Sequence, residues 1–153
     1  SKAEHGGIIK DGAKMVNAMA NSTVPKFTII MGNSYGAGNY AMCGKAYDPR
    51  LIAAWPSAQI AVMSGASAAK TLLQIRVASL KAQGKTIAKE EEDALLKEIT
   101  DKYNEQLSPY YAASRIWVDA VIDPTETRQF LAKGIEAANN APVEKFNVGV
   151  IQT

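Results

Sequence analysis

The sequence has little of the side-chain chemistry on which many enzymes depend, because its 153 residues include one cysteine and one histidine. The single cysteine, Cys43, excludes a disulfide framework and a zinc cluster. The single histidine, His5, lies near a chain end that we expect to fray, which disfavours a Ser-His-Asp triad or a histidine-ligated metal. No metal site is predicted.

Net charge and long apolar runs are also scarce. Seventeen basic against fifteen acidic residues leave a charge of +2, too small for a protein whose affinity for nucleic acid must come from neutralising phosphates. No apolar run approaches the roughly 18 residues of a membrane span. Residues 1–5 contain neither an initiator methionine nor an apolar leader, so we expect a cytoplasmic fragment of a longer chain.

The composition, 47% hydrophobic and 21% charged, is that of one globular domain. Apolar periodicity and capping signals predict helices over 8–22, 40–46, 66–81, 89–106, 109–115 and from the capping-box pattern at 123–126 to about 139. Apolar, β-branched runs predict strands over 26–31, 51–55, 59–63 and 118–122, with residues 146–151 as a further extended candidate. Helices that alternate with short strands indicate an α/β fold with parallel pairing.

A glycine-rich turn joins the strand at 26–31 to the short helix that follows, with glycines at 32, 36 and 38. Glycines allow positive φ and close approach of a ligand, and the first amides of a helix have no intrahelical acceptor, so the turn offers N–H donors to an anion or oxyanion. Equally, the glycines and alanines could serve only the close packing of helix on strand. The turn lacks the third glycine of the dinucleotide-binding fingerprint, which disfavours a Rossmann site.

A second strand-to-helix turn, Met63-Ser64-Gly65, also carries free amides and is a candidate for another wall of the same pocket, with Ser64 as helix cap. Residues 84–86 are no phosphate loop, because Ser79 occupies the position of the required glycine. The remaining candidates are assigned structural roles: a solvated helix face for 90–93, core packing for Tyr110, Tyr111 and Trp117, and an interior thiol for Cys43.

Five stretches in order carry a family resemblance: 7–15, 24–30, 34–42, 55–63, and 122–128 followed by 140–142. In this order they resemble the carboxyl-terminal half of the carboxyltransferase subunit of biotin-dependent acyl-CoA carboxylases and decarboxylases. The sequence of residues 35–44 and the charged helix expected at 89–106 are most similar to those of glutaconyl-CoA decarboxylase alpha subunits. The beta subunits of methylcrotonyl-CoA carboxylases are the alternative.

The resemblance implies a crotonase-like (ClpP/crotonase) β-β-α superhelix in which residues 1–153 form the biotin-side domain of a longer subunit. It implies that Ala37 and Gly38 donate backbone N–H groups to the ureido oxygen of biotin, and that the acyl pocket lies upstream of this chain. The other binding residues that it implies are Tyr35, Gly36, Tyr40, Met63, Ser64 and Gly65, with Tyr40 influencing substrate choice. Family members differ at position 64, which leaves the role of the second turn open.

The implied cofactor is biotin on a separate carrier, with a coenzyme A thioester as substrate. Carboxyl transfer between them develops negative charge on the thioester and ureido oxygens, which backbone amides stabilise without a side-chain nucleophile. The implied assembly is a homo-oligomer with the site at a subunit interface, and a membrane-bound partner subunit is possible. In isolation, the chain is expected to be inactive, and a purely non-catalytic assembly role is the competing hypothesis. Its expected interface surfaces are residues 36–46 and 110–117.

Overall fold

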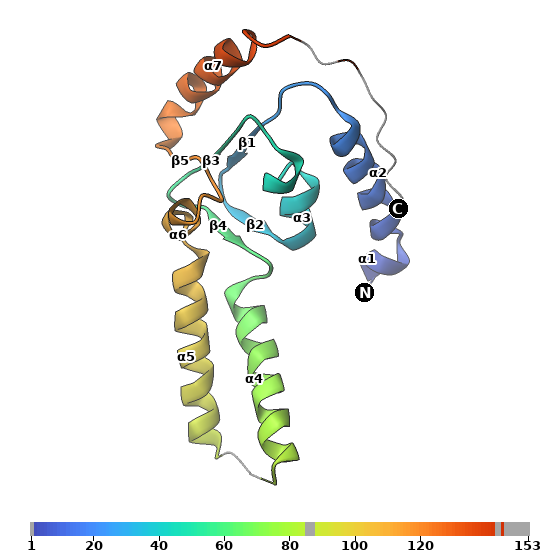
Figure 1. Ribbon diagram of the computed structural model, residues 1–153. Coiled ribbons are helices and arrows are strands. Elements are labelled where there is room, and N and C mark those ends of the chain that lie inside the picture. Colours follow the sequence, from blue (N-terminus) through green and yellow to red (C-terminus); the bar gives the residue numbers. More distant parts are fainter. Residues whose placement is uncertain (1, 85–87, 143–144, 146–153) are drawn as a thin grey trace.

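The structure is a computed structural model that describes residues 2–84, 88–142 and 145. Its elements follow one another as shown in Figure 1. In chain order they are α1 (Lys2–His5), α2 (Ile8–Asn21), β1 (Phe27–Ile30), β2 (Asn33–Tyr35), α3 (Gly36–Ala41), the 3₁₀ turn η1 (Lys45–Tyr47), β3 (Leu51–Ala54), β4 (Gln59–Ala61), α4 (Gly65–Ala82), α5 (Lys89–Leu107), α6 (Pro109–Ser114), β5 (Ala120–Val121), the 3₁₀ turn η2 (Pro124–Glu126) and α7 (Thr127–Ala138).

Two β-β-α units, one after the other, form the body. The first strand of each unit enters a parallel three-stranded sheet of order β1-β3-β5, and the second strand enters a parallel two-stranded sheet of β2 and β4. Phe27 pairs with Leu51 in the first sheet, and Asn33 pairs with Gln59 in the second. The second unit therefore lies beside the first, strand against equivalent strand, and the helices α3 and α4 begin at the same edge of the two-stranded sheet.

The α/β prediction is confirmed, and most of the predicted elements are present within two to three residues of the expected bounds. The segment at 32–46 differs: residues 33–35 form the short strand β2, and α3 begins at Gly36 rather than at residue 40. A segment of three residues is too short for the alternation of apolar and polar residues to distinguish a strand from a turn. The strand expected at 118–122 is limited to Ala120–Val121, and the extended segment expected at 146–151 lies outside the described residues.

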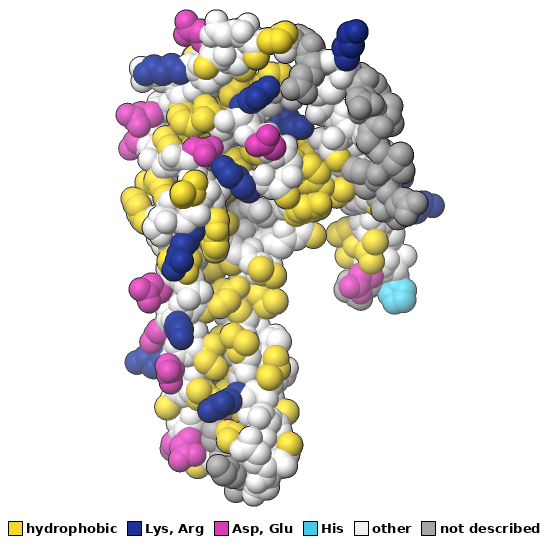
Figure 2. All heavy atoms as spheres, in the orientation of Figure 1, with side chains coloured by type: hydrophobic (Ala, Val, Ile, Leu, Met, Phe, Trp, Pro, Cys, Tyr) yellow, Lys and Arg dark blue, Asp and Glu magenta, His cyan; other side chains and the backbone are white. Residues whose placement is uncertain are grey.

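The helices α4 and α5 form a long hairpin that projects from the body (Figure 1). Ser64 caps α4 by accepting a hydrogen bond from the Ser67 amide, as predicted. Ser108 likewise caps α6, with Pro109 in its first turn. A groove of about 540 Å³ runs between the two hairpin helices, and Leu72 and Ile75 on α4 line it. Figure 2 shows hydrophobic side chains along this hairpin and over the α3 side of the body. No helix in the described ranges combines the length and the hydropathy needed to cross a lipid bilayer.

The core lies between the three-stranded sheet and α6. It is built from small and β-branched side chains, namely Ile30, Ile52, Ala54, Ala58, Ala112 and Val118. On another side of the sheet, α7 approaches β1 closely at Gly134, where a Cβ atom would lie 2.8 Å from the Phe27 ring and 3.0 Å from Leu51. The three-stranded sheet is thus closely packed against both helices.

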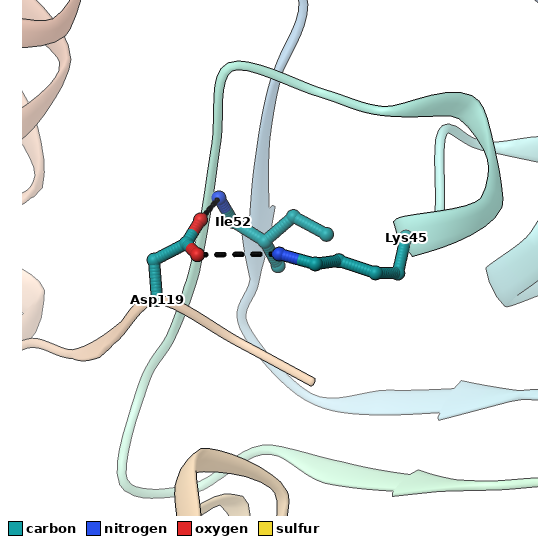
Figure 3. Close-up of polar contacts among 3 residues, drawn as sticks. All are labelled: Lys45, Ile52 and Asp119. Atoms are coloured by element: carbon teal, nitrogen blue, oxygen red, sulfur yellow. Dashed lines mark hydrogen bonds and ion pairs between the residues drawn. The ribbon is translucent and has the colours of Figure 1, made fainter. Parts of the chain in front are cut away.

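The Asp119 carboxylate joins the start of β3 to the segment that follows α3 (Figure 3). One oxygen accepts a hydrogen bond from the buried Ile52 amide at 2.8 Å, and the other lies 3.3 Å from Lys45 Nζ. The Asp119 amide in turn donates to the Ile52 carbonyl at 2.8 Å. Asp119 therefore satisfies a backbone donor that water cannot reach, and an ion pair at the surface adds to it.

We expect Asp119→Ala to lower the free energy of unfolding by about 1–3 kcal/mol, because the Ile52 amide loses its acceptor. Lys45→Ala, which removes only the half-exposed ion pair, should cost no more than about 1 kcal/mol. Urea unfolding of both variants checks the difference. Equal losses of unfolding free energy in the two variants would show that Asp119 stabilises the fold through the ion pair with Lys45 and not through the Ile52 amide.

Asp123 begins the turn into α7, as the capping pattern predicted. Its Oδ1 atom accepts a hydrogen bond from the Thr125 amide at 2.8 Å and a second from the Thr125 hydroxyl. These two hydrogen bonds, the hydroxyl bond first, lower the pKa of Asp123 below its ordinary value.

A lowered pKa means that Asp123 stabilises the folded state above the pKa of the unfolded chain, about 4, and loses this contribution as the pH falls through the folded pKa. The stability advantage of the natural protein over Asp123→Ala should therefore be constant at neutral pH and shrink below about pH 4. Urea unfolding at several pH values measures it. An Asp123→Asn variant, which keeps the cap without the titration, should not show this loss.

Candidate functional site

Two strand-to-helix turns lie side by side at one edge of the two-stranded sheet. Tyr35 at the end of β2 pairs with Ala61 at the end of β4, so Gly36 and Val62 follow at the same level. Gly36 has φ +54°, and a Cβ atom on it would lie 2.8 Å from the Val62 carbonyl oxygen. Only glycine allows this close approach, which holds the two turns against each other.

The amides of Ala37 and Gly38 belong to the first turn of α3, where helical amides have no intrahelical acceptor. No side chain caps this helix, and both residues are exposed. A Cβ atom at Gly38 would meet nothing within 4 Å, and Gly38 lines a hollow of about 530 Å³ that extends along β1 and β2. The turn thus carries helix-start amides at exposed residues, with open space beside Gly38.

The hypothesis that the glycines of this turn serve only close packing is therefore supported at one position and not at the two others. At Gly36, a side chain would collide with the neighbouring turn. At Gly38 and Gly32, a side chain would meet open space, so helix packing gives no reason for glycine there.

The second turn is held by α5. The Met63 carbonyl accepts a hydrogen bond from the Tyr103 hydroxyl at 3.1 Å, and a Cβ atom on the buried Gly65 would collide with the Asn104 side chain. The Ser64 hydroxyl is engaged by Ser67, both as acceptor from its amide and in a contact of 3.0 Å with its hydroxyl. Serine at position 64 acts here as a helix cap.

The two tyrosines of the predicted site have different surroundings. The Tyr35 hydroxyl donates to the Gln59 side chain, which lies back along β4, and its ring lines the hollow beside Gly38. Tyr40 is 48% exposed, and its ring lies against Tyr47 with 4.8 Å between centroids. Burial, with the Tyr40 phenol adding to it, raises the pKa of Tyr47 to about 12, so Tyr47 is neutral under all ordinary conditions.

A second hollow, of about 370 Å³, which Gly36 lines, could not be predicted from the sequence. Tyr103, Gln106 and Trp117 line it together with Asn39. Tyr103 and Gln106 come from a helix that the sequence indicated only as an amphipathic, exposed element. Their distance of about 40 residues from the second turn left no local signal.

Core packing was predicted for three aromatic residues and is wrong for two of them. Tyr110 is 62% exposed, because the short α6 buries only its alanine and proline side, and Trp117, which follows this helix, is 47% exposed. Tyr111 is half-buried, edge-on to Trp117. Cys43 is buried, as predicted for a structural thiol.

No Asp or Glu lies among the described residues that line the two hollows beside Gly36 and Gly38. Backbone donors without a nearby carboxylate suit an acceptor oxygen that becomes more negative during a reaction. The ureido oxygen of biotin is such an acceptor, so the residues present fit this group.

The sequence matches the carboxyl transferase domain family over residues 1–148. The mitochondrial methylcrotonoyl-CoA carboxylase beta chain of Arabidopsis thaliana is 49% identical over 152 residues, which is 99% of this chain and 26% of that protein. The biotin-dependent 3-methylcrotonyl-coenzyme A carboxylase beta1 subunit of Mycobacterium tuberculosis is 44% identical over 149 residues, 97% of this chain and 28% of that protein. The chain thus spans about a quarter of the length of these relatives, rather than half.

Among solved structures, transcarboxylase 12S, with methylmalonyl-coenzyme A and methylmalonic acid bound, is similar with a TM-score of 0.79 and 36% identity, over 93% of this chain and 26% of that one. The predicted crotonase-like fold is confirmed. The chain belongs to the carboxyl transferase domain family.

Proposed function

We propose that this chain is the biotin-side, carboxyl-terminal domain of a longer subunit that transfers a carboxyl group between biotin and an acyl-CoA. The paired turns carry the proposal: the exposed residues Ala37 and Gly38 begin a helix that no side chain caps, and the strand that leads to the second turn at 63–65 pairs with the strand before them. Acyl-CoA carboxyl transfer needs oxyanion stabilisation more than an acid or a nucleophile. The scarcity of histidine and cysteine in this chain agrees with that requirement.

In this proposal, Ala37 and Gly38 donate hydrogen bonds to the ureido oxygen of biotin, which, when bound, accepts or gives up the carboxyl group at its ring nitrogen. Gly36 fixes the distance between the two turns through its contact with Val62. Met63, Ser64 and Gly65 form the facing wall. Tyr40, half exposed and supported by Tyr47, limits the space next to the helix start.

We propose methylcrotonoyl-CoA as the acyl substrate. The sequence motifs favoured glutaconyl-CoA, with methylcrotonyl-CoA as the alternative, and the two relatives described above carry the alternative in their names. Both are named as carboxylases, so a membrane-bound partner, which accompanied the decarboxylase assignment, is no longer proposed. A cytoplasmic location stays a prediction, because one of these relatives is named as mitochondrial.

We further propose that the subunit works as a homo-oligomer together with a biotin carrier. The predicted interface surfaces at 36–46 and 110–117 expose large apolar side chains, among them Met42, Tyr110, Ile116 and Trp117. A contiguous exposed apolar patch is typical of a docking face. An oligomer that brings an acyl-CoA half to this chain would cover it.

The test is carboxyl transfer by the full-length subunit, measured with free biotin and a panel of acyl-CoA thioesters. We expect the fastest turnover with methylcrotonoyl-CoA and the second fastest with glutaconyl-CoA. In a separate titration, NAD and ATP should not bind at the glycine-rich turn. The isolated chain should show little or no activity, because the acyl half is upstream. Efficient turnover by residues 1–153 alone would contradict the division of the site.

A further inference from the structure

We infer that Tyr103 is a positioning residue for the candidate active site: its hydroxyl, through the Met63 carbonyl, sets the direction of the Ser64 amide in the second turn. The inference rests on the proposed function, in which residues 63–65 form the wall that faces Ala37 and Gly38. Tyr103 Oη donates to Met63 O at 3.1 Å, from the last turns of α5 across to the second residue after β4.

The argument depends on the planarity of the peptide group. The carbonyl of Met63 and the N–H of Ser64 belong to one peptide unit, and in a trans peptide they point in opposite directions. No cis peptide bond occurs among the described residues. A hydrogen bond that holds the Met63 oxygen toward α5 therefore holds the Ser64 N–H away from α5.

No other neighbouring contact among the described residues orients the peptide group between Met63 and Ser64. The Ser64 side chain is engaged in the cap of α4, so it does not hold its own amide. Among the described residues, Tyr103 is the only hydrogen-bond donor to the Met63 carbonyl. The Asn104 side chain limits only the next residue, Gly65, by steric contact. The hydroxyl of Tyr103 is thus the group that would fix this peptide plane.

Tyr103 also stands between the two hollows that meet at the base of the hairpin. Its ring lines the groove between α4 and α5 and, at the same time, the hollow beside Gly36. The ring therefore fills space, whereas the hydroxyl orients the turn. Tyr103→Phe separates the two contributions, since it keeps the ring and removes only the hydrogen bond.

The experiment uses the full-length subunit with Tyr103→Phe and, as matched control, Thr100→Val. Thr100 lies on the same helix and also donates a hydroxyl hydrogen bond, but to Leu96 within α5 and away from the turn. Tyr103→Phe should lower kcat of carboxyl transfer by roughly two- to tenfold, the effect of one neutral hydrogen bond. KM for the acyl-CoA should be unchanged, because the acyl pocket lies upstream, and Thr100→Val should leave kcat unchanged.

A second readout does not depend on activity. Hydrogen–deuterium exchange followed by mass spectrometry should show faster exchange of the peptide that contains residues 62–66 in Tyr103→Phe but not in Thr100→Val. Faster exchange supports the positioning role even if the subunit has no carboxyl transfer activity, in which case the proposed function fails and this part of the inference stands. Unchanged exchange, or unchanged kcat in an active subunit, would overturn the inference.

Discussion

Gly38→Val in the full-length subunit is expected to lower kcat of carboxyl transfer by a factor on the order of 10²–10³, the loss typical of an impaired oxyanion donor. The β-branched side chain restricts the backbone of the helix start and places methyl groups where the ureido ring approaches. The fold should be kept, because a Cβ atom at Gly38 meets nothing within 4 Å. Steady-state kinetics and urea unfolding of the same preparation separate these two effects.

Ala37→Ser is the control for this change. Serine keeps the backbone amide and adds one small polar group at an exposed position, so most of the activity should remain. A folded Gly38→Val subunit with normal turnover would place the chemistry away from this turn. A Gly38→Val subunit that unfolds would instead favour a packing role for Gly38, against the open space that the structure shows.

Gly36→Ala is expected to reduce the free energy of unfolding by about 2–5 kcal/mol, from left-handed strain and an enforced contact together. The added Cβ atom would lie 2.8 Å from the Val62 carbonyl oxygen, and φ +54° disfavours any L side chain. The two turns must then move apart, so activity should fall with stability.

Gly32→Ala serves as the matched control in urea unfolding, because Gly32 has open space around its Cα and no positive φ. It should change the stability far less than Gly36→Ala. Similar losses in both variants would show that glycine is required along the whole turn for a reason other than the contact with Val62.

Local signals were sufficient for most of the fold. Pro109 and the two serine caps at 64 and 108 fixed where helices begin, because a cap is a contact between residues two or three apart. The amphipathic pattern of 89–106 predicted α5 almost to its ends. The strand β2 escaped prediction because its three residues, Asn33–Tyr35, are polar and gain their strand conformation from pairing with β4.

The candidate site was only partly within reach of the sequence. The motif order indicates the family, and the resemblance assigned free amides to Ala37 and Gly38, although the residues alone placed the helix start at 40 rather than at Gly36. By contrast, the need for glycine at Gly36 comes from Val62, which is 26 residues away. The support of the second turn by Tyr103 spans 40 residues. Such contacts depend on the stacking of one β-β-α unit on the next, which no local pattern specifies.

The most direct test of the central claim is a structure of the full-length subunit with biotin bound. The ureido oxygen should lie about 2.7–3.2 Å from the backbone nitrogens of both Ala37 and Gly38, the distance of N–H···O hydrogen bonds. The ring should occupy the open space beside Gly38, with residues 63–65 on its far side. Biotin bound elsewhere, with these two amides facing only solvent, would contradict the account.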